Sequence, residues 1–211
     1  NINFFYEDSH LIIYFLFIFT IFFLFFSFNN EFSDNLLSIS SSMSNIGFSV
    51  NENQPRLDFL LLILVIIGGS FFSTSSGLRF VKIYSLFKYS INQILSFSRP
   101  KNVFMNKLMF TNIKFDFTEI NKYFLTIIIF ILSLFILSSL LSFSGIDFEK
   151  SFKLSILTLM NTVNSSLYGL EDFDFNSLHY LIKYCLILFM IIGRIELLTI
   201  LLLLKKFLFK N

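Results

Sequence analysis

The chain of 211 residues is 55% hydrophobic and only 14% charged, and 33 of its residues are phenylalanine. Soluble domains carry about 25% charged residues, so the composition excludes an ordinary soluble domain and indicates a membrane protein. With a single cysteine, Cys185, the chain has neither an internal disulfide nor a cysteine-rich metal site.

Four apolar runs are long enough to cross a membrane, because a spanning helix needs about 20 apolar residues. They are Leu11–Phe28, Phe59–Phe87, Tyr123–Phe143 and Tyr180–Phe209. The second run is interrupted by glycine and small hydroxyl residues at Gly68–Gly77. No cleavable signal peptide is expected, since acidic and not basic residues precede the first run.

The distribution of charge predicts the orientation of these crossings. Segment 88–122 and the C-terminus are rich in Lys and Arg, whereas segments 29–58 and 144–179 are mainly acidic. Cytoplasmic loops carry an excess of Lys and Arg, so both termini are expected on the cytoplasmic side. The two acidic segments are then external loops.

Each external loop contains a segment typical of a short helix, with a helix-start residue followed by about four turns of apolar and hydroxyl residues. The segments read NNEFSDNLLSISSSMSNIGF and IDFEKSFKLSILTLMNTVNSS. A shift of 117 residues aligns Met43 with Met160 and Ile46 with Val163, and it also superposes the first crossing on the third. We interpret this as an internal repeat of crossing, short helix, loop and crossing.

A helix of about 13 residues is too short to span a bilayer, so each loop is predicted to enter the membrane and return as extended backbone. Irregular backbone at membrane depth is tolerated only where it is buried in protein or faces water. Backbone carbonyls that face a water-filled axis can replace the hydration shell of a cation. Gly47 suits such a strand, because glycine adopts the φ values that aim successive carbonyls inward.

Four segments resemble, in order and spacing, the Trk/Ktr/HKT superfamily of potassium transporters, and most closely its bacterial TrkH group. SMSNIGF is similar to the filter stretch T-T-T-G-F, and IIGGSFFSTSSGLRFVKIYSLFK is similar to F-I-G-G-x-x-G-S-T-x-G-G-I-K-V in the third repeat. LMNTVNSSLYG resembles the fourth-repeat filter N-N-V-G-P-G-x-G, and FMIIGRIELLTILLL resembles the last helix, L-G-R-L-E-x-x-T. The resemblance implies four repeats around one cation pathway, of which this chain supplies the third and fourth.

The resemblance also implies which residues act. The expected ion-binding filter consists of Ser44, Asn45, Ile46, Gly47, Phe48, Asn161, Thr162, Val163, Asn164 and Ser165. Potassium ligands are expected at Asn45, Ile46, Thr162 and Val163. The expected gate consists of Gly68, Gly69, Ser70, Ser73, Thr74, Ser75, Ser76, Gly77 and Arg194.

Some of these residues depart from the family or have a second interpretation. Asn164 stands where the family has glycine and Ser165 where it has proline, which leaves the potassium-over-sodium preference open. Gly68–Gly77 can also be a notch that lets helices pack closely. Arg194 costs about 2.5–3.5 kcal/mol at the bilayer centre, so we expect it to face the gate; a tie between neighbouring helices is the alternative.

The predicted fold is an all-α membrane protein with two tandem helix–pore-loop–helix repeats, the second helix of the first repeat being broken. The expected units are a first repeat over 1–88, a cytoplasmic connecting segment over 89–122 and a second repeat over 123–211. The implied function is potassium uptake through a carbonyl-lined filter gated by an intramembrane loop and an arginine. It involves no enzyme activity and no cofactor besides the transported potassium ion. The alternative is a non-conducting, truncated or degenerate half that only packs against a partner.

Half a ring cannot close a filter, so the expected partner is an N-terminal half with two further repeats. The absence of an initial methionine favours a fragment of a longer chain over a natural half. The resemblance adds a homodimer in the lipid of a bacterial inner membrane, and a cytoplasmic nucleotide-binding subunit of the TrkA or KtrA kind docked on the basic segment 88–122. No nucleic acid is expected as a partner, and channel and symport both remain open.

Overall fold

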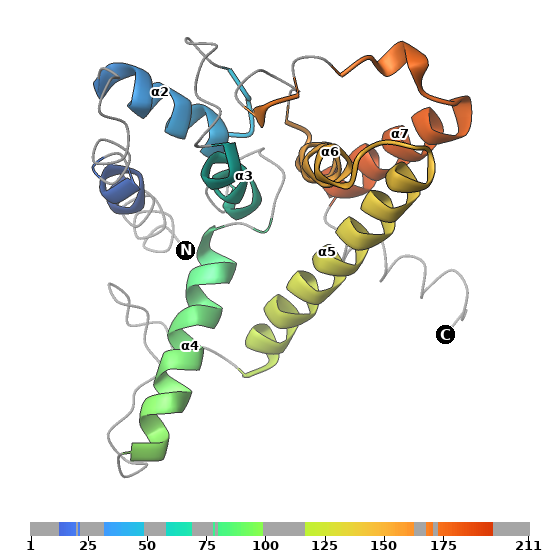
Figure 1. Ribbon diagram of the computed structural model, residues 1–211. Coiled ribbons are helices and arrows are strands. Elements are labelled where there is room, and N and C mark those ends of the chain that lie inside the picture. The colour runs from blue at the N-terminus through green and yellow to red at the C-terminus, as the bar shows by residue number, and fades with distance from the viewer. Residues whose placement is uncertain are drawn as a thin grey trace, which may run out of the picture.

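The computed structural model describes residues 13–19, 21, 32–48, 58–68, 78, 80–98, 117–162, 168–170 and 173–195. Every regular element in these residues is a helix (Figure 1). After a helical segment at 13–19 come α2 (Phe32–Met43), α3 (Asp58–Ile67), α4 (Phe80–Ser98), α5 (Phe117–Phe143), α6 (Phe148–Met160), the 3₁₀ helix η3 (Phe175–Ser177) and α7 (Tyr180–Ile195). The predicted all-α class is therefore confirmed over the described residues.

Helix α5 is, within the described residues, the one helix both long and apolar enough to cross a membrane, over Ile120–Phe143. It contains the third predicted crossing and begins six residues earlier, at Phe117. Large apolar side chains are exposed along most of its length: Phe124, Leu125, Ile128, Ile131, Leu132, Phe135, Ile136, Leu140 and Phe143. An exposed apolar surface of this extent marks contact with lipid or with another protein.

The second apolar run forms two helices. Helix α3 ends at Ile67, Gly68 follows with a left-handed φ of 70°, and α4 begins at Phe80. The backbone N–H of Leu78 donates to the carbonyl of Ile66 at 3.4 Å, so the chain returns to the end of α3 before α4 begins. The ring of Phe80 also contacts Phe15, with 4.8 Å between centroids, which places the first apolar run beside the start of α4.

The helices extend beyond two of the predicted boundaries. Helix α4 continues to Ser98, ten residues past the expected end of the first repeat at residue 88. Helix α5 begins inside the expected connecting segment 89–122. Figure 1 shows α4 and α5 extending away from the cluster of shorter helices. Part of the connecting segment is therefore a continuation of these two helices.

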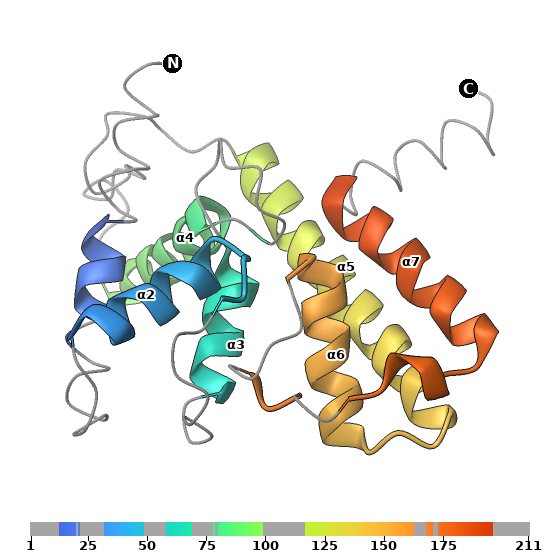
Figure 2. The same cartoon turned by 90° about the horizontal axis from the view of Figure 1, so that it is seen from above.

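The core lies where the short helices meet. Helix α6 is flanked by α3 on one side and α7 on the other, with α5 against it (Figure 2). Every residue from Leu154 to Met160 is buried, as are Leu61, Leu62, Leu64 and Val65 of α3. A helical stretch that is buried on all sides, as 154–160 is in α6, is typical of the centre of a helical protein.

Helices α6 and α7 cross at Gly193. A Cβ atom built on Gly193 would lie 2.9 Å from the carbonyl carbon of Leu159, and closer still to its oxygen. Both are backbone atoms, so no side-chain rotation would relieve the contact. The crossing therefore requires glycine on α7.

Candidate functional site

The two short helices α2 and α6 end in the same way. Asn45 follows α2 and Asn161 follows α6, and both are left-handed, with φ values of 59° and 54°. The backbone N–H of Ile46 donates to the carbonyl of Ser41, and that of Thr162 to the carbonyl of Leu157, each at 3.0 Å. This bond across the last helical turn belongs to the C-terminal cap known as the Schellman motif. The chain therefore leaves both helices along equivalent paths.

The matching cap residues give a slightly different repeat offset from the one in the sequence. Asn45 and Asn161 are 116 positions apart, one fewer than the shift of 117 that aligns Met43 with Met160. The same offset of 116 separates the first residues of the two helices, Phe32 and Phe148, so it holds from the start of each helix to its cap. At this offset Ile46 corresponds to Thr162, and not to Val163 as the shift of 117 predicted.

The first predicted filter segment, 44–48, lies entirely within the described residues. Gly47 is buried with φ of 77°, while the flanking Ile46 and Phe48 side chains are 59% and 58% exposed. The backbone N–H of Phe48 donates to the Ser41 hydroxyl at 2.6 Å, which holds segment 44–48 against α2. This segment thus begins at the C-terminal end of α2, where a helix carries partial negative charge.

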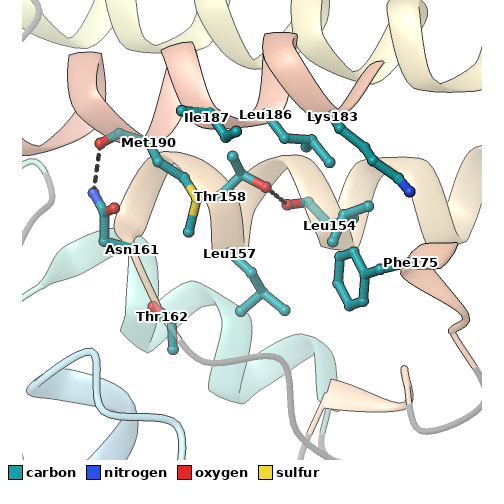
Figure 3. Close-up of a pocket in the computed structure, with 10 residues that line it drawn as sticks. All are labelled: Leu154, Leu157, Thr158, Asn161, Thr162, Phe175, Lys183, Leu186, Ile187 and Met190. Carbon is teal, nitrogen blue, oxygen red and sulfur yellow. Dashed lines mark hydrogen bonds between the residues drawn. The ribbon is translucent and has the colours of Figure 1, made fainter. Parts of the chain in front are cut away.

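Two residues of the second predicted filter segment are described, Asn161 and Thr162; Val163, Asn164 and Ser165 lie outside the described residues. The side-chain amide of Asn161 donates to the carbonyl of Met190 at 2.9 Å, which ties the cap of α6 to α7 (Figure 3). The hydroxyl of Thr162 is buried and has no hydrogen-bond partner among the described residues. Filter roles for these residues stay predictions.

The structure brings the surroundings of both loops together. The hydroxyl groups of Ser42, in the last turn of α2, and Tyr168, after the second loop, lie 3.3 Å apart, and both residues are fully buried. Tyr168 belongs to the motif LMNTVNSSLYG, but the family resemblance implied no role for it. Its hydroxyl links the return limb of the second loop to the helix that leads into the first.

An ion pair that was not anticipated lies beside this contact. Asp58, the first residue of α3, has its Oδ2 3.6 Å from Nζ of Lys153 on α6, and Lys153 also pairs with Glu149 at 2.9 Å. The Asp58 and Lys153 side chains are only 9% and 14% exposed. Gly169 closes the site: it has φ of 69°, and a Cβ on it would lie 2.6 Å from the Asp58 carboxylate. The feature of the sequence that could have indicated this ion pair is a lysine, Lys153, within the apolar part of α6.

Of the predicted gate residues, the structure describes Gly68 and Arg194. Gly68 terminates α3, and Gly69, Ser70, Ser73, Thr74, Ser75, Ser76 and Gly77 lie outside the described residues. Arg194 is exposed in the last turn of α7, directly after the Gly193 crossing, and so lies near the C-terminal end of α6. Contact between Arg194 and the gate segment stays a prediction.

A groove of about 550 Å³ lies between α6 and α7, and we call it the α6–α7 groove. Figure 3 shows its walls: Leu154, Leu157, Thr158, Asn161 and Thr162 from α6 and its cap, Lys183, Leu186, Ile187 and Met190 from α7, and Phe175 of η3. The described residues hold no cluster of three His, Cys, Asp or Glu side chains suited to a metal ion.

A solved structure with a similar fold is the potassium transporter TrkH from Vibrio parahaemolyticus. The TM-score is 0.80 at 20% sequence identity, and the match covers 93% of this chain and 44% of the transporter chain. This chain therefore shares its fold with slightly less than half of that protein. No protein-family profile matches the sequence, and no curated protein matches it.

Proposed function

We propose that this chain is half of a potassium-conducting membrane protein and supplies two of the four loops that surround the ion path. The observation that carries the proposal is the pair of short helices with the same left-handed cap. They occur in a fold shared with a potassium transporter. The alternative, a half that only packs, gives no account of why both loops leave their helices along equivalent paths.

In this proposal the ion is held by backbone oxygen atoms. The C-terminal ends of α2 and α6 both lead into the pore loops, so their partial negative charge lies near the ion. Carbonyl groups of 44–48 and 161–165 replace part of its hydration shell, and the companion half supplies the rest. Gly47 keeps the strand in a conformation that other residues adopt only under strain.

The remaining architecture belongs to the same proposal. The chain comprises a first repeat over 1–88, a connecting segment over 89–122 and a second repeat over 123–211, with both termini on the cytoplasmic side of a bacterial inner membrane. Its partners are a companion half with two further repeats, a second copy of the complete protein and a nucleotide-binding regulatory subunit on the basic segment. These assignments rest on the charge distribution and the family resemblance.

The direct test is uptake of rubidium, a potassium tracer, by cells that lack their own potassium uptake and express the complete protein. Uptake above that of cells carrying an empty vector, with normal insertion in the membrane, is the expected result. Normal insertion with no rubidium or sodium uptake would favour the non-conducting alternative. Preference of rubidium over sodium would also establish the ion.

Replacing Gly47 with serine should weaken the preference for potassium over sodium. The left-handed φ of 77° costs a residue with a side chain about 1–2 kcal/mol. The strand would relax and redirect its carbonyls, with roughly a 5- to 30-fold change in ion preference. The change in preference is measured by how strongly added sodium inhibits rubidium uptake.

Gly145→Ser is a matched control. Gly145 also has a left-handed φ, 90°, but it lies on the α5–α6 turn, where an added Cβ would have no atom within 4 Å. This variant should leave the ion preference intact. The same loss of preference in both variants would mean that backbone strain anywhere perturbs the protein, and Gly47 would then have no special place in the filter.

Replacing Arg194 with alanine should increase resting potassium flux. A fixed positive charge in a narrow path repels cations, and Arg stays charged under all physiological conditions. Rubidium efflux from loaded vesicles measures the change, with Lys150→Ala, an exposed lysine at the start of α6, as the control. Wild-type efflux at normal expression would leave Arg194 only a structural tie between helices.

A further inference from the structure

The return limb of the second loop, 168–170, packs against the first repeat. Tyr168 is fully buried, and Leu170 is 3% exposed. Between them, Gly169 lies so close to the Asp58 carboxylate at the start of α3 that an added Cβ would be 2.6 Å from it. Two buried side chains and this close approach hold the limb in place. The Tyr168 ring therefore projects from a fixed backbone.

The hydroxyl group of Tyr168 meets the last turn of α2. It lies 3.3 Å from Oγ of Ser42, and both residues are 0% exposed. Phenylalanine would fill nearly the same space, and a buried hydroxyl costs free energy unless it is hydrogen-bonded. A tyrosine placed opposite a buried serine therefore indicates a specific tie between the two loops as well as packing.

The same turn of α2 holds the first predicted filter segment, 44–48. The carbonyl of Ser41 accepts a hydrogen bond from the backbone N–H of Ile46 at 3.0 Å. The hydroxyl of Ser41 accepts one from the backbone N–H of Phe48 at 2.6 Å. Ser41 precedes Ser42 directly, so the residue that holds the segment is the chain neighbour of the residue that contacts the tyrosine. A shift of this turn would move the segment with it.

We propose that Tyr168 is a positioning residue for the ion filter: through Ser42 it fixes the last turn of α2, and thereby the direction of the carbonyl groups of 44–48. The inference rests on the proposed function, because it takes that segment as part of the filter. The second loop thus sets the geometry of the first. The family motif N-N-V-G-P-G-x-G has glycine at the position of Tyr168, so the tie belongs to this chain's own sequence.

Ion preference in the complete protein tests the proposal. Tyr168→Phe and Ser42→Ala each remove one oxygen atom and nearly preserve the packing. Each should weaken the preference for rubidium over sodium by roughly 2- to 10-fold, the factor that corresponds to the net free energy of one hydrogen bond. The double variant should show no larger change than either single variant, because both substitutions remove the same contact.

Ser38→Ala is the matched control on the same helix. The Ser38 hydroxyl donates within α2, to the carbonyl of Asp34 at 2.9 Å, and takes no part in the tie. This variant should keep the wild-type ion preference. Effects that add in the double variant, or a loss of preference in Ser38→Ala equal to that in Tyr168→Phe, would overturn the proposal.

Hydrogen exchange of the purified complete protein tests the tie without ion flow. In Tyr168→Phe, peptides that contain 44–48 should exchange roughly 2- to 10-fold faster, because the segment opens more often. Ser38→Ala should leave their exchange unchanged. Wild-type exchange of these peptides in Tyr168→Phe would overturn the proposal, and so would equally faster exchange in every helix. Faster exchange confined to 44–48, in a protein that takes up no rubidium, would refute the proposed function and retain the tie between the loops.

Discussion

Replacing Lys153 with methionine is expected to destabilise the complete protein by about 3–5 kcal/mol, because it leaves the Asp58 carboxylate charged and unpaired among buried residues. Within the part of the chain that the structure describes, Asp58 Oδ1 has no hydrogen-bond partner, and Oδ2 lies 3.6 Å from Nζ of Lys153. Loss of this contact also removes a tie between α3 and α6. The apparent melting temperature in detergent, with the amount of protein in the membrane, measures the effect.

Two further variants test whether loss of the Asp58–Lys153 ion pair is responsible for the loss of stability. Glu149, which contacts the same lysine, is 79% exposed, so Glu149→Gln should leave the stability almost unchanged. The double variant Asp58→Leu with Lys153→Met removes both charges and should be more stable than Lys153→Met alone, since apolar replacement of a buried pair is often neutral. If Lys153→Met melts at the wild-type temperature, the ion pair contributes nothing to the fold.

Replacing Gly193 with alanine should separate α7 from α6 and destabilise the protein by about 1–3 kcal/mol or more, as overpacking does in close-packed interiors. The added Cβ would meet the backbone of Leu159, which cannot move without displacing α6. The displacement would also strain the nearby bond between the Asn161 amide and the Met190 carbonyl. Reduced melting temperature is the measured outcome.

Ile191→Ala provides the comparison for Gly193→Ala, because Ile191 lies on the same helix and is 56% exposed. It should leave the melting temperature almost unchanged. Equal stability of Gly193→Ala and the wild type would show that the two helices are not in close contact at this point. The loss expected at Gly193 also differs from the Gly47 effect, which concerns ion preference and leaves the protein folded.

The sequence predicted those features that depend on local residue patterns. Apolar and hydroxyl periodicity located two short helices, α2 and α6. Helix α3 ends at Ile67, just before the predicted break at Gly68–Gly77, of which only Gly68 lies within the described residues. Helix α4 continues past Lys88 to Ser98, beyond the predicted apolar run, which ended at Phe87. A helix continues past a charge unless glycine, proline or a cap stops it, and α4 ends at Ser98, two residues before Pro100.

Contacts between distant residues could not be predicted from local patterns. Asp58 and Lys153 lay in stretches interpreted as external loops, where charges are usually solvated, and nothing near either residue indicates the other. The Ser42–Tyr168 contact depends on two loops that meet only in the folded chain. The shift of 117 came from the Leu-Ser-Ile and Met matches inside the helices, whereas the starts of α2 and α6 and their two cap residues are each 116 positions apart.

In the membrane setting proposed for this chain, the length of α5 would make the protein sensitive to the thickness of the bilayer. Its apolar stretch of 24 residues is about 36 Å long at 1.5 Å per residue, against a hydrocarbon core of roughly 30 Å. A tilt of about 30° would reconcile the two, within the range that membrane helices adopt. Because α5 packs on α6, a thinner or thicker membrane would change the tilt of α5 and, with it, the orientation of the short helix α6.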